Sequence, residues 1–155
     1  LMRRQVLKIV GGMALSPWSL PAASAQADGV EQTVAALLAA TEEGSILQID
    51  LEDLCHTLKL CGRSAVSFTV TNHDANKVLD ACRDALAQMP SHGVKAAVVV
   101  CSGNGKNFRL TNCAEVFRVV QHAMYESAYL VFGVVSDPTL VDAMCVTWLA
   151  GAPDG

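Results

Sequence analysis

The chain has 155 residues, of which 52% are hydrophobic and only 17% are charged, so it holds enough apolar material for one packed domain with a short appendage. Its formal net charge of −4 and its isoelectric point near 5.4 argue against the basic face that a nucleic-acid-binding protein needs. The sequence contains no repeat of fixed period and no low-complexity tract.

The first 27 residues have the features of an export signal. Arg3 and Arg4 precede an apolar run, and the segment ends in small residues that fit an A-x-A cleavage site. The arginine pair resembles a twin-arginine signal, although no Ser or Thr stands before it. The apolar run is shorter than the ~20 residues of a membrane helix. We therefore predict a signal peptide over residues 1–27 and a periplasmic location, without an integral membrane segment. The alternative is an N-terminal extension of a cytoplasmic protein.

The next segment is predicted to contain two helices joined by an acidic loop. Helical spacing and several alanines favour a helix over residues 30–43, which Gly44 ends, and a second helix ends at Gly62. Asp50 and Asp53 stand at the start of the second helix. The local chemistry favours capping, because a carboxylate accepts hydrogen bonds from the free N–H groups there. The alternative is that both acids polarise a water in a molecule docked against the loop.

The rest of the chain alternates between strands and helices. Apolar periodicity predicts strands at residues 64–71, 94–101, 128–135 and 143–150, and helices at residues 74–89 and 112–125. Asn112 and Glu115 resemble a capping box, and the last two strands are predicted to be antiparallel because their link is short. Right-handed crossovers place both helices on the same side of the sheet. The predicted fold is an α/β two-layer sandwich, a four-stranded mixed sheet with two helices on one face.

No motif predicts an active site that the chain completes by itself. Gly105-Lys106 lacks both the earlier glycine and the following Ser or Thr of a phosphate-binding loop. The four histidines show no metal-ligand spacing, so no metal site is predicted. Six cysteines would allow disulfides in an exported protein. Three of them lie on predicted inner faces and are expected to be buried thiols, namely Cys82, Cys101 and Cys145.

The run from Ser45 to Leu54 reads Ser-Ile-Leu-Gln-Ile-Asp-Leu-Glu-Asp-Leu. It resembles the loop and helix that open the C-terminal domain of FtsZ, the bacterial tubulin, where the family typically reads Gly-Leu-Ile-Asn-Leu-Asp-Phe-Ala-Asp-Val. Both acids match, whereas Gln48 replaces an Asn and Ser45 replaces a Gly. Residues 93–103 and 145–151 are similar to two strands of the same domain. The resemblance extends over about residues 30–152 and implies the same two-layer fold.

In that family the loop enters the nucleotide pocket of the next subunit in a filament. The resemblance implies that Asp50 and Asp53 help to activate the water that attacks the GTP γ-phosphate in trans. It also implies that Gln48, Ile49 and Leu51 belong to the interaction loop. The implied partner is an FtsZ- or tubulin-like GTPase subunit, or a second copy of this chain. The sequence has no Gly-Gly-Gly-Thr-Gly phosphate loop, so we expect it to bind no cofactor alone and to meet GTP only through a partner subunit.

These observations predict three segments: a signal peptide at residues 1–27, an FtsZ C-terminal-like domain at residues 28–152 and a tail at residues 153–155. The leading hypothesis is an assembly or protein-interaction module without its own catalysis, related to cell division or the cytoskeleton. The alternative is an exported, stand-alone periplasmic domain that reuses the scaffold to bind another protein or a small ligand, since fold does not fix function. An enzyme with its own active site ranks third.

Overall fold

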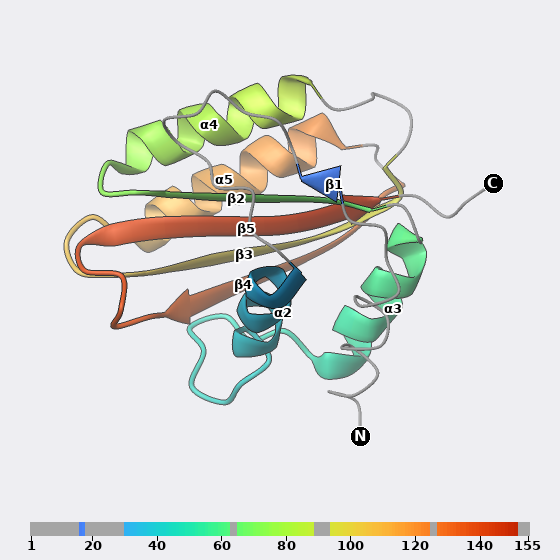
Figure 1. Ribbon diagram of the computed structural model, residues 1–155, viewed down its shortest axis with the longest axis horizontal. Coiled ribbons are helices and arrows are strands. Elements are labelled where there is room, and N and C mark those ends of the chain that lie inside the picture. The colour runs from blue at the N-terminus through green and yellow to red at the C-terminus, as the bar shows by residue number, and fades with distance from the viewer. Residues whose placement is uncertain (1–15, 18–29, 63–64, 89–93, 125–126, 152–155) are drawn as a thin grey trace.

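A mixed β-sheet with helices on both faces forms the body of the protein (Figure 1). The computed structural model describes residues 16–17, 30–62, 65–88, 94–124 and 127–151. The elements follow in the order β1 (Ser16–Pro17), α2 (Val30–Ala39), α3 (Leu51–Cys61), β2 (Val66–Asn72), α4 (Ala75–Ala87), β3 (Ala96–Asn104), α5 (Leu110–Ala123), β4 (Tyr129–Ser136) and β5 (Ala143–Gly151). The predicted β-α-β-α-β-β succession after the opening helices is confirmed.

The strands lie in the order β1-β2-β5-β3-β4. Strand β5 runs antiparallel to both of its neighbours, so that Trp148 pairs with Phe68 of β2 and with Val99 of β3. Strands β3 and β4 are parallel, and the short β1 lies parallel to the outer edge of β2. Strand β5 is buried along its whole length, as its continuous apolar sequence requires of a strand covered on both faces. The predicted four-stranded mixed sheet is confirmed, with β1 as an addition.

The last strand does not pair with the strand before it. Strands β4 and β5 run in opposite directions, as the short link predicts, but β3 lies between them in the sheet. The link, residues 137–142, crosses the end of β3. There the Asp137 N–H donates to the Gly103 carbonyl at 2.9 Å, and the Lys106 N–H donates to the Asp142 carboxylate at 2.8 Å. These two bonds hold the crossing in place.

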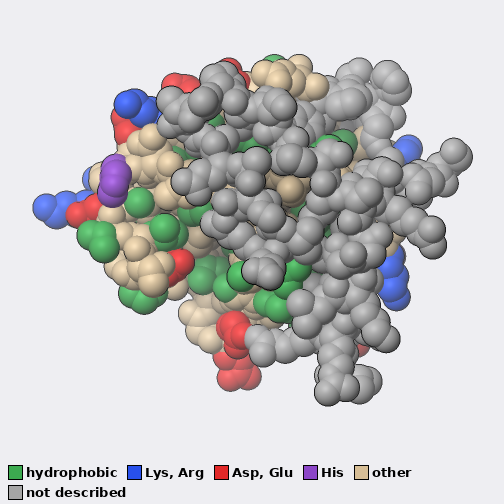
Figure 2. Space-filling view, viewed as in Figure 1, with side chains coloured by type: hydrophobic (Ala, Val, Ile, Leu, Met, Phe, Trp, Pro, Cys, Tyr) green, Lys and Arg blue, Asp and Glu red, His purple; other side chains and the backbone are tan. Residues whose placement is uncertain are grey.

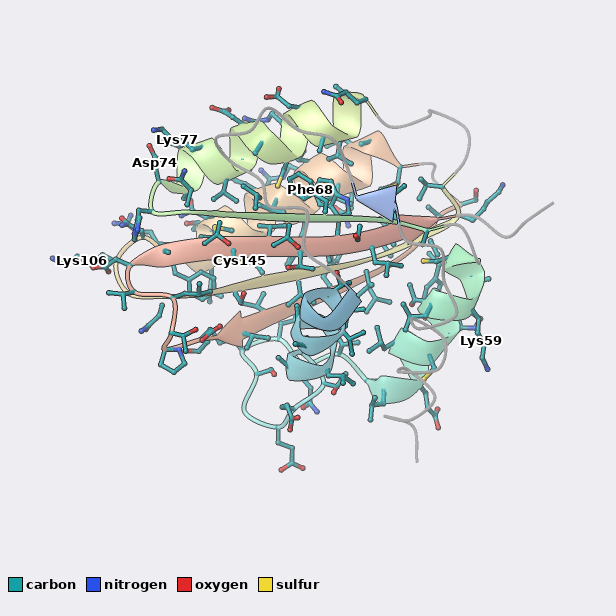
Figure 3. The ribbon with its side chains drawn as sticks, viewed as in Figure 1. Lys59, Phe68, Asp74, Lys77, Lys106 and Cys145 are labelled. Atoms are coloured by element: carbon teal, nitrogen blue, oxygen red, sulfur yellow. The ribbon has the colours of Figure 1, made fainter. Side chains whose placement is uncertain are left out.

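Helices α4 and α5 cover one face of the sheet, as predicted (Figure 1). The side chains between these layers form the larger hydrophobic cluster. Phe68 stacks on Trp148 with ring centroids 4.2 Å apart, and Phe117 stacks on Phe132 at 4.4 Å. Figure 3 shows Phe68 on the side of β2 that faces these helices. The Phe68–Trp148 pair is buried and the Phe117–Phe132 pair is half-buried. Packed aromatic pairs contribute both large apolar area and preferred ring geometry, so this layer should contribute much of the stability of the fold.

The two helices of this layer begin differently. Asp74 caps α4, because its carboxylate accepts from a first-turn N–H at 2.9 Å, as the sequence predicts. Helix α5 begins at Leu110, so the predicted capping box of Asn112 and Glu115 is wrong. Arg109 occupies the cap position in an extended conformation and makes no side-chain cap bond. Because of the tight turn after β3, α5 begins two residues before the start that Asn112 and Glu115 predict.

Helices α2 and α3 pack on the opposite face and form a smaller cluster with β3 and β5. Both helices were predicted, but α2 ends at Ala39 instead of residue 43. Thr41 and Ser45 explain the early end, because their hydroxyls donate to last-turn carbonyls at 2.7 and 3.1 Å. Helix α3 is followed, as predicted, by Gly62 in the left-handed region with φ of 73°.

Of the predicted signal peptide, only residues 16–17 are described, and they form β1. The remainder of residues 1–27 and the predicted tail, residues 153–155, lie outside the described residues. Export and a periplasmic location therefore stay predictions. In the described part of the chain, no helix combines the length and apolarity that a bilayer crossing requires.

Candidate protein-interaction site

The residues that the sequence singles out lie in the segment that links α2 to α3 and enters α3. We call residues 45–53 the acidic loop. It lies below the sheet in Figure 1, on the face that α2 and α3 cover. The side chains of Gln48, Asp50 and Asp53 are exposed, Leu51 is half-buried against the smaller cluster, and Ile49 is buried. The structure therefore brings both predicted acids to the surface at one helix end.

Three contacts fix the shape of the acidic loop. Leu47 forms an isolated antiparallel bridge with Val134 of β4, with N–H to carbonyl distances of 3.1 and 3.0 Å in the two directions. The Gln48 side-chain amide and the Ile49 N–H donate to the carbonyls of residues 41 and 40 at 3.0 and 2.8 Å. These bonds tie the middle of the loop to β4 and to the residues that follow α2.

Ile49 is the apolar anchor of the acidic loop, with only 2% of its surface exposed. It lies against Gly133 of β4, where an added Cβ would stand 2.9 Å from the Ile49 Cδ1 and 2.8 Å from the Ala40 Cβ. A side chain at position 133 would push the loop away from the sheet. Ile49 therefore holds the loop in place through a buried side chain, and its predicted place in the interaction loop stays a prediction.

The exposed apolar side chains of the loop are instead Ile46 and Leu47, at 48% and 45% exposure. They are not among the residues that the sequence predicts as contacts. The available signal was their position, since they are apolar residues in a polar loop that match neither the preceding nor the following helical pattern. Together they form a small apolar surface beside the acids, which a partner could cover.

Asp50 is the N-cap of α3, which confirms the capping interpretation. Its Oδ1 accepts from the Glu52 N–H at 2.7 Å, and its carbonyl accepts from the Leu54 N–H at 2.9 Å. The cap fixes the orientation of the carboxylate while leaving the side chain exposed. Capping and a contact with a partner are therefore compatible roles for the same residue.

Asp53 is the third residue of α3 and points its carboxylate into solvent. The helix is held on the sheet by Leu54 and Leu58, which are fully buried, and the Thr57 hydroxyl donates to the Asp53 carbonyl at 2.7 Å. With Glu52, the first turn carries three exposed carboxylates beside two exposed aliphatic side chains. Such a group can accept hydrogen bonds from water or from a cationic partner. Figure 2 shows further acidic side chains at the lower edge of the molecule, at the tip of the α2–α3 link.

We also searched the described part of the chain for metal sites and pockets outside the acidic loop. No group of three or more His, Cys, Asp or Glu side chains there is placed to hold a metal ion. A pocket of about 270 Å³ lies between the small residues of α2 and the sheet, and its lining includes Ala36, Ser102 and Thr147. A second, open pocket of about 350 Å³ lies where α4 and α5 begin, near Lys106 and Arg109.

No family model matches the chain, and no curated protein matches it in sequence. Solved structures match it by fold. An FtsZ variant (W319Y) from M. jannaschii superposes with a TM-score of 0.66 at 17% identity, over 79% of this chain and 37% of that protein. An empty FtsZ dimer from M. jannaschii superposes with a TM-score of 0.66 at 16% identity, over 79% of this chain and 36% of that protein. CetZ2 from Haloferax volcanii, in a protofilament with GTPγS bound, superposes with a TM-score of 0.55 at 16% identity, over 98% of this chain and 50% of that protein.

These comparisons confirm the fold expected from the sequence. The chain is an α/β domain with a four-stranded mixed sheet and the arrangement of the FtsZ C-terminal domain. It spans 37% of the FtsZ variant and half of the CetZ2 subunit, so it corresponds to a single domain of those proteins.

Proposed function

We propose that this domain is a protein-interaction module of the FtsZ/tubulin type, which docks its acidic loop onto a GTPase subunit. The observation that carries the proposal is the hydrogen-bonded loop that exposes Ile46 and Leu47 beside Asp50 and Asp53. The similar solved structures include an FtsZ dimer and a CetZ2 protofilament, which supports a role in subunit association.

Docking is favoured by the apolar side chains and by the order of the loop. Ile46 and Leu47 leave nearly half of their surface in water, and covering them would remove that area from solvent. The bridge from Leu47 to Val134 already fixes the backbone, so little conformational freedom remains to be lost on binding. The acids then contribute to specificity, because they favour a partner whose surface presents cationic groups or hydrogen-bond donors.

The finer part of the proposal concerns catalysis in trans. GTP would be held by the partner, and a water between the two chains would attack its γ-phosphate. Asp53 is the better candidate to orient this water, because its carboxylate is exposed on the first turn of α3. Asp50 commits Oδ1 to the helix cap and would act mainly by holding that turn in position.

The test is a GTPase assay of FtsZ with and without the purified domain, combined with a filament-length measurement. We expect the wild-type domain to change both phosphate release and filament length. Asp53→Ala should reduce the change in turnover at least about tenfold while the domain still binds, because positioned acid or base groups contribute about 10²–10⁴-fold. Leu47→Ser should weaken binding itself, measured by co-sedimentation.

Two matched variants keep this test specific. Glu52→Ala removes the same charge from the same exposed turn and should leave turnover within about twofold of wild type. Val141→Ser removes another exposed aliphatic residue, in the β4–β5 link, and should leave binding unchanged. The proposed docking is refuted if the wild-type domain changes neither turnover nor filament length. If Glu52→Ala and Asp53→Ala reduced GTP turnover equally, the loss would reflect the total negative charge, and the proposed role of Asp53 in catalysis would be refuted.

The alternative is an exported domain that binds a small ligand or another protein. The pocket beneath α2 favours it, but its volume of about 270 Å³ is below the roughly 300–1,000 Å³ of most ligand sites. Cell fractionation with N-terminal sequencing of the mature protein separates the two proposals. A mature chain that starts near residue 28 in the periplasm would support the alternative, and an intact Arg3-Arg4 in the cytoplasm would rule out export.

A further inference from the structure

A polar pocket lies at the end of the sheet where β2 and β3 finish, on the side that α4 and α5 cover. Its volume of about 350 Å³ is within the roughly 300–1,000 Å³ of most ligand sites. Its walls are the β2–α4 loop, the β3–α5 loop and the first turns of both helices, and every lining residue except Ala75 is polar. Because β2 and β3 both run antiparallel to β5, their carboxyl ends meet at this edge. Ligands of open α/β sheets usually bind outside the carboxyl ends of strands.

Asp142, in the link before β5, ties the two loops of the pocket together. Its carboxylate accepts from the Lys106 N–H at 2.8 Å, and its carbonyl accepts from the Asn107 side-chain amide at 2.9 Å. The same carbonyl lies 3.2 Å from the Nδ1 of His73, on the other loop. A side chain at Gly105 would overlap the Asp142 carboxylate. The walls of the pocket are therefore set by contacts with one residue of a third segment.

The pocket has more free donors than free acceptors. The Asp74 Oδ1 already accepts from the Asn76 N–H at 2.9 Å, and the Asp142 Oδ1 accepts from the loop backbone. In the described part of the chain, no hydrogen bond or ion pair engages the Lys106 ammonium or the Arg109 guanidinium. Figure 3 shows Asp74 and Lys106 at the same end of the sheet, where α4 begins. Two unpaired cationic side chains thus border one pocket of a chain whose formal net charge is −4.

The start of α5 adds to the positive character of the pocket. Arg109 occupies the cap position and makes no side-chain cap bond, so no side chain satisfies the first N–H groups of the helix. Thr111 and Asn112, in the first turn, also line the pocket and bring a hydroxyl and a side-chain amide. These neutral donors supplement the two cationic side chains, which supply the full charges.

We propose that this pocket binds a phosphate-type oxyanion, either free phosphate or the phosphoryl group of a small molecule. The Arg109 guanidinium would donate two parallel hydrogen bonds to the anion, and the Lys106 ammonium would add a second positive charge. Two cationic groups suit a doubly charged phosphate better than a singly charged carboxylate. The site is independent of the proposed docking, because the acidic loop lies on the face that α2 and α3 cover.

The experiment follows the backbone amides of the full chain by NMR while sodium phosphate is added, with sodium chloride at equal ionic strength as the reference. We expect saturable shifts at Lys106, Leu110 and Thr111 with phosphate and none with chloride. Glycerol phosphate, glycerol and acetate are titrated in the same way. Tighter binding of glycerol phosphate than of phosphate would identify a phosphorylated small molecule as the ligand class, and equal binding would identify the phosphate group alone.

Arg109→Ala should weaken phosphate binding at least about tenfold, because hydrogen bonds to a charged group are lost. Arg109→Lys keeps the charge and should recover part of that loss. Arg118→Ala is the matched control, since it removes the same charge from an exposed position of the same helix outside the pocket, and it should leave binding within about twofold of wild type.

Three results would overturn the proposal. Phosphate shifts no larger than those with chloride would show that no anion site exists, and equal losses from Arg109→Ala and Arg118→Ala would show a general charge effect. Acetate binding as tight as phosphate binding would contradict the choice of a phosphate-type anion. Each variant is checked for native circular dichroism. If an Arg109 variant fails to fold, Lys106→Ala and the wild-type shift map decide the outcome.

Discussion

The two faces of the sheet differ in how they are built and in what they present. The face under α4 and α5 contains the larger cluster, with the Phe68–Trp148 and Phe117–Phe132 ring stacks. The face under α2 and α3 contains a smaller, aliphatic cluster with no such stacks among its members, and it carries the acidic loop. We therefore expect the aromatic layer to contribute more to stability, while the aliphatic layer positions the candidate surface with a few specific contacts.

The strongest way to break this division is to remove the centre of the larger cluster. Trp148→Ala deletes a side chain that is 1% exposed and stacked on Phe68, so the free energy of unfolding should fall by about 3–5 kcal/mol. Urea denaturation followed by circular dichroism measures the loss. Val141→Ala, at a position 68% exposed, is the control and should stay within about 0.5 kcal/mol of wild type. A loss below about 1 kcal/mol for Trp148→Ala would contradict the division.

A smaller effect is expected on the opposite face from Gly133→Ala. The new methyl group would overlap Ile49 and Ala40, so the loop must shift, at a cost of about 1–3 kcal/mol. Hydrogen exchange at the Leu47 and Ile49 amides should speed up, while exchange in α4 stays unchanged. Adding Ile49→Val, which removes the nearer Ile49 carbon, should recover part of the loss. If the double variant were no better than the single, the contact would not be the cause.

The smallest effect is expected at the N-cap of α3. Asp50→Ala removes the carboxylate that accepts from the Glu52 N–H and should destabilise the domain by about 1 kcal/mol. Asp50→Ser can still cap the helix and should recover most of that loss, but it would not restore a charge-dependent contact with the partner. Thermal unfolding and the GTPase assay together separate the two roles. A fully stable Asp50→Ala domain would show that the cap contributes nothing.

Local patterns were sufficient for most elements of the fold. Apolar alternation predicted β2, continuous apolar runs predicted β3 and β5, and Asp74 correctly predicted the start of α4. The position of β5 between β2 and β3 was not predictable, because strand pairing depends on contacts between distant segments and not on periodicity. The capping box at Asn112 failed for a related reason, since the turn after β3 determines where α5 begins.

The candidate site was predictable in part. The amino-acid sequence of residues 45–54 was sufficient to identify the acidic loop. The capping role of Asp50 followed from the ability of a carboxylate to accept hydrogen bonds from free N–H groups at a helix start. Two features required the structure. Ile49 faces inward because Gly133 leaves room for it, and Leu47 pairs with a strand far along the chain. Each depends on a contact between residues that no local pattern connects.

The Leu47–Val134 bridge has a mechanical consequence. Its two opposed hydrogen bonds, at 3.1 and 3.0 Å, join the acidic loop to the outer edge of β4. A neighbouring molecule that pulls on Ile46 and Leu47 therefore transfers its load directly into β4, and through the β3–β4 ladder into the centre of the sheet. If the proposed docking occurs, tension on the loop would therefore be borne by the sheet and would bypass the short helix α2.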